Sequence, residues 1–362
     1  GTIKPQRGAA SQFRTFSMKT NMADQKILTM KDIAKMLNVS VATVSRALKD
    51  SPNISREQRE KIQKFAREHN YYPNVIAEQL RHTRLGPAKV IGVILPEFVH
   101  YYFSSVLSGI EKEANLQGYR ILVAQSNEKY EREVEICESF FQNKVCGIIV
   151  SQAKDTKNYD HFKRMLDNGV PLVFYDRICA GINCNRVVVD DYNGAFKAVS
   201  YLIERGAKRV AYYGTDLDLE IGKNRFNGYK DALHKYGMEV EDALVRICDT
   251  SEQAELVTPG VLAMPNRPDA IFTVNDDTAI GVLHTAKRMG LSVPADLMIC
   301  GFTNGFRAIA CDPMLTTVEQ RGVEVGQQAV QILVDRLQGK HPMNHVEKRI
   351  VKTRLVVRGT TR

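Results

Sequence analysis

The chain lacks the features of membrane proteins and secreted proteins. It contains no tryptophan, and none of its apolar runs approaches the roughly 20 residues that a membrane-spanning helix needs. Residues 1–26 hold basic groups without the apolar core of a secretory signal. The seven cysteines form no CxxC pair, and no histidine stands near them at zinc-ligand spacing. We therefore expect reduced thiols in a cytoplasmic protein with no membrane partner; a redox pair of Cys179 and Cys184 is the alternative.

The chain also lacks the local motifs of common enzyme classes. It has no GxSxG, no HExxH, no P-loop and no GxGxxG after an apolar run. Its eight histidines are scattered without a recognisable pairing. We expect no catalytic residues, no cofactor and no metal site.

Positive charge is confined to one end of the chain. Residues 1–86 contain sixteen Lys and Arg against seven Asp and Glu, whereas residues 87–362 contain 34 of each kind. A basic head on a neutral body favours a polyanionic partner for the head. We expect residues 1–26 to be a disordered tail or a remnant of cloning. A basic tail that only aids solubility would explain these residues, but it would not explain the helical pattern of residues 27–73.

Residues 27–73 have the pattern of a helix-turn-helix domain. Three helix starts are predicted, at Thr29 followed by Asp32, at Ser40, and at Ser55, where Gln58 completes a capping box. The second helix buries an apolar side and leaves short side chains and one arginine on the other. Such a face lets the backbone approach base edges in a major groove. Its residues are Val41, Ala42, Thr43, Ser45 and Arg46.

From residue 88 onward, short apolar runs alternate with amphipathic segments. Apolar runs at 90–95, 120–124, 146–150, 171–175, 187–189, 210–213, 270–274 and 298–302 indicate strands buried on both faces. Helices are predicted near 104–117, 129–142, 157–168, 191–205, 222–236, 277–289 and 321–338. These eight runs, and roughly ten strand candidates in all, are too many for one doubly wound sheet of five or six strands. We therefore predict a two-lobed α/β domain with two doubly wound parallel sheets and a ligand cleft at the carboxyl ends of their strands.

Residues that follow these strands are the candidate cleft residues. The charges of Asp176 and Arg225 favour ligand contact, because both would otherwise lie unexplained beside apolar strands. Asn275 is equally well placed to cap the next helix, and Tyr102 and Phe103 could equally be packing residues. The segments concerned are 96–103, 126–127, 151–152, 176–177, 275–276 and 303–304.

Together these segments resemble the lactose/galactose repressor family of bacterial transcriptional regulators, over about residues 29–358. The similarity rests on residues 30–34 (MKDIA), 39–46 (VSVATVSR), 72–77 (YPNVIA) with Leu80, 275–276 (ND) and 315–320 (LTTVEQ). The resemblance implies a helix-turn-helix domain, a hinge helix, and a periplasmic-binding-protein-like domain that binds a sugar or related metabolite.

The resemblance implies a role in DNA binding for specific residues. Val41, Ala42 and Arg46 would read bases, and Arg46 suits a guanine. Residues 74–87 would form the hinge and linker; in the family two hinge helices pair in the minor groove, where Leu80 would act as a wedge. The alternative for Leu80 is an ordinary linker residue. The remaining implied contacts are Ser40, Thr43, Ser45, Asn53, Ser55, Asn74 and Ala77.

The resemblance also implies an effector site and a dimer on a pseudopalindromic operator. The implied effector contacts are Tyr102, Phe103, Ser151, Asp176, Arg225, Asn275, Thr303 and Gln320. The family usually has an aspartate after the last cleft strand, where this chain has Thr303-Asn304, and this departure argues against an ordinary neutral sugar. We expect one lobe to comprise about 88–188 and 319–348, and the other about 189–318 and 349–358. A solute-binding receptor and a sugar-modifying enzyme share the fold, but the basic head and the missing acid–base cluster disfavour them.

Overall fold

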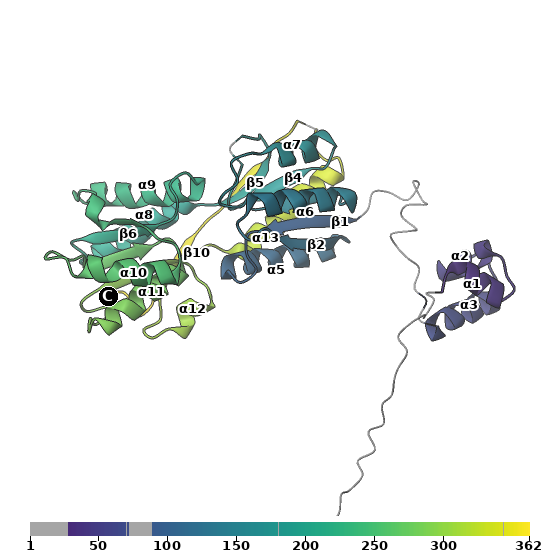
Figure 1. Cartoon of the computed structure of the whole chain (residues 1–362), viewed down its shortest axis with the longest axis horizontal. Coiled ribbons are helices and arrows are strands. Elements are labelled where there is room, and N and C mark those ends of the chain that lie inside the picture. The colour runs from purple at the N-terminus through teal and green to yellow at the C-terminus, as the bar shows by residue number, and fades with distance from the viewer. Residues whose placement is uncertain (1–27, 70, 72–88, 180, 343) are drawn as a thin grey trace, which may run out of the picture. The chain divides into compact units, whose positions relative to one another are not determined.

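The computed structural model describes residues 28–69, 71, 89–179, 181–342 and 344–362 (Figure 1). The chain divides into two compact units, residues 1–86 and 87–362. The predicted tail and the hinge residues Asn74, Ala77 and Leu80 lie outside the described residues. No helix in the described ranges is long and apolar enough to cross a membrane.

The first unit contains the three helices that its caps predict. They are α1 (Met30–Met36), α2 (Val41–Leu48) and α3 (Arg56–Glu68). Ser40 and Ser55 each accept a hydrogen bond from the backbone of the third helical residue. The complete capping box lies at Thr29 and Asp32, whereas at Ser55 the structure shows one of the two bonds. A small core of Ile33, Ala34, Val44, Ala47 and Ile62 joins the helices.

The second unit consists of two lobes, each built on a six-stranded sheet, which confirms the predicted fold class (Figure 1). The first sheet is parallel throughout and has the order β11-β5-β4-β3-β1-β2. Its strands are β1 (Val90–Leu95), β2 (Arg120–Gln125), β3 (Gly147–Val150), β4 (Leu172–Tyr175), β5 (Asn185–Val189) and β11 (Lys348–Val351), and its helices are α5 (Tyr101–Leu116), α6 (Tyr130–Gln142), α7 (Asp160–Asp167) and α13 (Gly322–Leu337).

The second sheet has the order β12-β10-β9-β8-β6-β7, and its edge strand β12 is antiparallel. Its strands are β6 (Val210–Gly214), β7 (Val245–Ile247), β8 (Ala270–Thr273), β9 (Met298–Thr303), β10 (Thr316–Glu319) and β12 (Arg354–Val356). Its helices are α8 (Asp191–Glu204), α9 (Glu220–Lys235), η1 (Asp242–Leu244), α10 (Ser251–Leu262), α11 (Asp276–Arg288) and α12 (Phe306–Ala310).

The chain passes between the lobes three times, and one predicted lobe boundary was wrong. The crossings follow β5, β10 and β11. Residues 349–351 were assigned to the second lobe, but they continue β11, which pairs with residues 186–189 of β5 in the first sheet. The last crossing therefore comes at residues 352–353.

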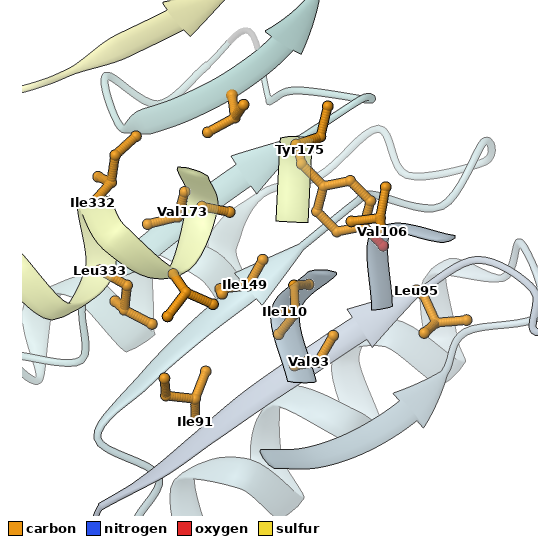
Figure 2. Packing of buried hydrophobic residues seen from close by; sticks show 14 of the residues in the cluster. Ile91, Val93, Leu95, Val106, Ile110, Ile149, Val173, Tyr175, Ile332 and Leu333 are labelled. Carbon is orange, nitrogen blue, oxygen red and sulfur yellow. The ribbon is translucent and has the colours of Figure 1, made fainter. Parts of the chain in front are cut away.

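The core of the first lobe fixes two helices on one face of its sheet. Figure 2 shows Val93 and Ile149 of the sheet beneath Ile110 of α5 and Leu333 of α13. The two helices also approach each other closely at Gly109 of α5. A Cβ built on this glycine would lie only 2.1 Å from a backbone oxygen of α13. This packing holds the N-terminal end of α5, where Tyr102 and Phe103 lie.

Candidate functional site

A cavity of about 250 Å³ lies between the two lobes. Its lining comes from segments that follow the carboxyl ends of strands in both sheets, the place where such sheets bind ligands. Of the eight predicted effector residues, seven line it: Tyr102, Phe103, Asp176, Arg225, Asn275, Thr303 and Gln320. Ser151 is fully buried and is not among the lining residues.

The Arg225 side chain is already paired within the protein. Its Nε and Nη2 each lie 2.8 Å from Asp191 Oδ1, and its Nη1 donates to the Val274 carbonyl at 2.6 Å. The guanidinium also lies 4.0 Å from the ring centroid of Phe302. The expectation that its charge would be unexplained without a ligand was therefore wrong. Burial raises the pKa of Asp191 to about 6, against the opposing effect of Arg225.

Asp176 is the buried carboxylate that remains available to a ligand. It is 5% exposed, lines the cavity, and lies 4.0 Å from Arg177 Nε. Burial raises its pKa, while Arg177, Arg225 and His100 act in the opposite direction. Its φ of 57° is in the left-handed region, a conformation that costs energy in a residue other than glycine and is concentrated at functional sites.

Other cations in the lining are also paired with carboxylates. Arg177 Nη1 lies 2.5 Å from Glu128, and Arg307 Nη1 lies 3.2 Å from Asp277. Lys154, in the first lobe, donates to Asp249 of the second lobe across 2.7 Å. The cleft thus offers carboxylates and hydroxyls more readily than an unpaired positive charge.

Asn275 caps a helix and also lines the cavity, so the two roles that the sequence left open are compatible. Its side-chain oxygen accepts from the Thr278 backbone at 2.8 Å, which caps α11. Its amide nitrogen donates to the Asp249 carbonyl at 2.7 Å, and the residue lines the cavity. The cap fixes this side chain at the cleft.

The end of β9, where the sequence departs from the family, has an unusual backbone. Thr303 has a φ of 140° and donates to Gln320 Oε1 at 3.0 Å. Positive φ is exceptional for a β-branched residue. Asn304, at φ 64°, accepts from Arg358 and donates to Glu319. Thr303 therefore presents the polar group at this position of the cleft.

Several cavity residues were missed by the sequence analysis. One of them is His100, whose Nδ1, like the hydroxyl of the predicted Tyr102, is buried without a hydrogen-bond partner among the described residues. His100 lay within a candidate segment but was not chosen. Glu128, Lys154 and Thr215 follow β2, β3 and β6, so the strand-end rule that found Asp176 could also have found them. Asp249 follows β7, a short and partly exposed strand that no apolar run marks in the sequence.

The predicted DNA-reading helix α2 exposes the expected face. Val41, Ala42 and Arg46 are exposed, whereas Val44 and Ala47 are buried. The hydroxyls of Ser40 and Thr43 lie 2.8 Å apart at the start of the helix. Ser45 is half-buried, and Asn53 and Ser55 are exposed beside α3. The exposed surface is therefore made of short side chains and one guanidinium.

Comparison with known proteins decides the family. Residues 29–74 match the model of the LacI family of bacterial regulatory proteins, and residues 199–361 match that of a periplasmic-binding-protein-like domain. The transcriptional repressor CytR of Escherichia coli K12 is 32% identical over 335 residues, 92% of this chain and 96% of CytR. The chain belongs to the LacI family. It is a DNA-binding transcriptional regulator.

Two further proteins are similar over nearly the whole chain. The NTD biosynthesis operon regulator NtdR of Bacillus subtilis is 30% identical over 336 residues, covering 92% of this chain and 99% of NtdR. A Lac repressor dimer bound to its operator and the anti-inducer ONPF shares the fold, with a TM-score of 0.80 at 24% identity over 93% of this chain and 99% of that one.

Proposed function

We propose that this LacI-family protein is a dimeric repressor of a pseudopalindromic operator, controlled by a small molecule bound between its lobes. It would act at the nucleoid in the cytoplasm and catalyse no reaction. The observation that carries the proposal is the cavity between the two sheets, which gathers strand-end residues of both lobes and two residues of positive φ, Asp176 and Thr303. Bending of the lobes about the three crossings would change this cavity.

For DNA binding, the proposal assigns the exposed face of α2 to the major groove. Arg46 would donate to a guanine, and the small side chains of Val41 and Ala42 would contact base edges. Backbone phosphates would be contacted by Ser40, Thr43, Ser45, Asn53 and Ser55, and the minor groove by Asn74, Ala77 and Leu80.

The charge distribution in the cleft restricts the class of effector. Because Arg177, Arg225 and Lys154 already contact carboxylates, an anionic ligand would have to break an ion pair. Asp176 instead offers acceptors to hydroxyl, amide or amino donors, and Phe103 and Tyr102 offer ring surface. Thr303-Asn304 argued against an ordinary neutral sugar because the family's aspartate is missing there, but Asp176 supplies a carboxylate elsewhere in the cleft. We therefore infer a neutral or cationic ligand rich in donors, such as a sugar, an amino sugar or a nucleoside, in preference to a sugar phosphate or sugar acid.

Effector control requires that the ligand bind two arrangements of the lobes with different affinity. Such coupling in allosteric proteins is typically about 1–3 kcal/mol, or roughly 5- to 150-fold in the affinity for the second ligand. The effector could act as an inducer or as a corepressor, and the sign of the coupling distinguishes the two.

A ligand screen tests the cleft assignment. Thermal shifts would be measured with neutral sugars, amino sugars, nucleosides, sugar phosphates and sugar acids, and each positive would be titrated by calorimetry into wild type and Asp176→Asn. We expect a neutral or cationic compound to bind wild type and to lose at least about tenfold in affinity in the variant, as expected for a buried carboxylate contact. Equal affinity for both proteins would exclude the proposed site.

A further inference from the structure

A second cluster of ligand-type side chains lies outside the cleft, in the loop between α13 and β11. His341, His345 and Glu347 each place one ligand atom so that all of these atoms lie within 4.8 Å of one another. The two imidazole rings are stacked, with centroids 4.6 Å apart and planes inclined by 29°. The sequence-based expectation that the histidines pair with nothing recognisable was therefore wrong, because a His-x₃-His spacing in a loop escaped it.

Hydrogen bonds hold the described backbone of this loop at Pro342, between the two histidines, and at Glu347, after them. Arg336 Nη1 donates to the Pro342 carbonyl at 2.5 Å, and the same carbonyl accepts from the His345 backbone at 3.0 Å. The Glu347 backbone donates to Asn185 Oδ1 at 2.8 Å, immediately before β11 joins the sheet. Hydrogen bonds therefore hold the backbone at or next to each of the three ligand side chains.

The charge around Glu347 leaves its carboxylate able to change partner. Arg349 Nε donates to Glu347 Oε1 at 2.6 Å, while Arg349 Nη1 donates to Gln331 Oε1 at 3.1 Å. If the Glu347 carboxylate turned toward the histidines, Arg349 would keep its hydrogen bond to Gln331. Both histidines are exposed and Glu347 is half-buried, so an ion could reach the cluster from solvent.

We propose that His341, His345 and Glu347 form a binding site for a divalent transition metal, with Zn²⁺ as the best match. Two imidazole nitrogens and one carboxylate are a common three-residue ligand set for zinc, whose fourth position is then filled by water. Ligand bonds of about 2.0–2.2 Å in a tetrahedron require donor atoms roughly 3.3 Å apart, so the ligand atoms must approach one another by at most about 1.5 Å. Rotation of exposed side chains is sufficient for that. Ca²⁺ and Mg²⁺ fit poorly, because both prefer oxygen ligands.

Metal titration of the full-length protein tests the site directly. Zn²⁺ would be titrated against a chromophoric chelator, and Co²⁺ binding would be followed by visible absorption. We expect one metal per chain, a visible Co²⁺ spectrum without the near-ultraviolet charge-transfer band of thiolate ligation, and at least about tenfold weaker binding in both His341→Ala and His345→Ala. Glu347→Gln should weaken binding as well.

His284→Ala is the matched control. His284 is also exposed, and its Nδ1 lies 3.5 Å from Glu255 Oε1. This pair contains a single histidine, so it lacks the second imidazole of the proposed metal site. The control should bind metal like wild type. The proposal is overturned if His341→Ala/His345→Ala retains wild-type stoichiometry and affinity, if wild type binds no metal, or if Co²⁺ shows thiolate ligation; the stacked rings would then serve packing alone. Circular dichroism would verify that each variant is folded.

Discussion

Lys154 and Asp249 form an ion pair between the two lobes at the cleft, with Nζ 2.7 Å from Oδ2. Thr215 donates to the same carboxylate oxygen at 2.6 Å. Burial alone would raise the pKa of Asp249, but Lys154, Thr215 and Arg177 outweigh it, so the pKa lies below its ordinary value. This pair stabilises the arrangement of the lobes in which the cavity is formed.

Removing this pair should favour opening of the cleft. For Lys154→Ala we expect effector affinity to fall by up to roughly fivefold, because an ion pair with a partly exposed member contributes up to about 1 kcal/mol. Calorimetry on Lys154→Ala, Asp249→Asn and the double variant would give the pair's coupling energy. Arg56→Ala, which removes an exposed ion pair with Glu60 in the first unit, is the control and should leave effector affinity unchanged. Fully additive effects of the two cleft changes would contradict the role of the pair.

The buried carboxylate of Asp276 should make stability depend on pH. It accepts from Thr317 Oγ1 at 2.5 Å and from the Gly305 backbone at 2.8 Å, and burial raises its pKa to about 6. Because the folded state holds this proton more tightly than the unfolded state, the group's stabilising contribution is present below pH ~4 and is lost as pH rises through about 6.

Asp276→Asn should therefore flatten the change in unfolding free energy between pH 4 and 6. The expected reduction is on the order of 2–3 kcal/mol, from a shift of about two pKa units. Urea unfolding at closely spaced pH values measures it, with the exposed Asp218→Asn as the control. An unaltered pH profile would show that Asp276 is not the titrating group.

Arg46 should determine specificity more than general DNA affinity. Arg46→Ala is expected to weaken binding to a selected operator by about 1–3 kcal/mol and to relax the preference at one base pair. Operators would be selected from a random pseudopalindromic library, and affinities measured by fluorescence anisotropy at fixed salt. Arg120→Ala, an exposed arginine on β2, is the control and should bind like wild type. Unchanged affinity and sequence preference in Arg46→Ala would refute the assignment of α2.

Substitution by alanine should change the free energy of unfolding in opposite directions at two glycines. A Cβ at Gly109 would meet a backbone oxygen of Val323 at 2.1 Å, so Gly109→Ala must separate α5 from α13 and should cost about 1–3 kcal/mol. Gly260 in α10 has no heavy atom within 4 Å of that position, so Gly260→Ala should stabilise by about 0.5–1 kcal/mol. Chemical unfolding of both variants measures these changes. Equal changes in unfolding free energy would contradict the close packing of α5 against α13 at Gly109.

The sequence predicted elements whose pattern is determined locally and missed those determined by neighbours. Each of the seven helices predicted in the second unit is present, with ends within three residues of those expected. Helix α10 was missed because it contains Pro259, a residue that disfavours the interior of a helix. In the structure Thr250 caps the start of this helix. The strands β7, β11 and β12 are short and half-exposed, so they lack the continuous apolar run that marks a buried strand.

The candidate site shows the same limit. The strand-end rule brought Asp176, Asn275 and Thr303 to the cleft, because topology alone places the carboxyl ends of parallel strands together. It could not assign partners. The ion pair of Arg225 with Asp191 depends on how α9 packs against α8, and that of Lys154 with Asp249 depends on the separation of the lobes.

Operator binding in the presence of the effector tests the central claim most directly. Fluorescence anisotropy would compare operator affinity with and without the compound found in the screen, for wild type and for Asp176→Asn. We expect that compound to change the operator affinity of wild type at least about fivefold, consistent with a coupling of 1 kcal/mol or more, and to leave the variant unchanged at the same concentration. A compound that occupies the cleft of wild type at saturation while operator affinity stays constant would contradict the account.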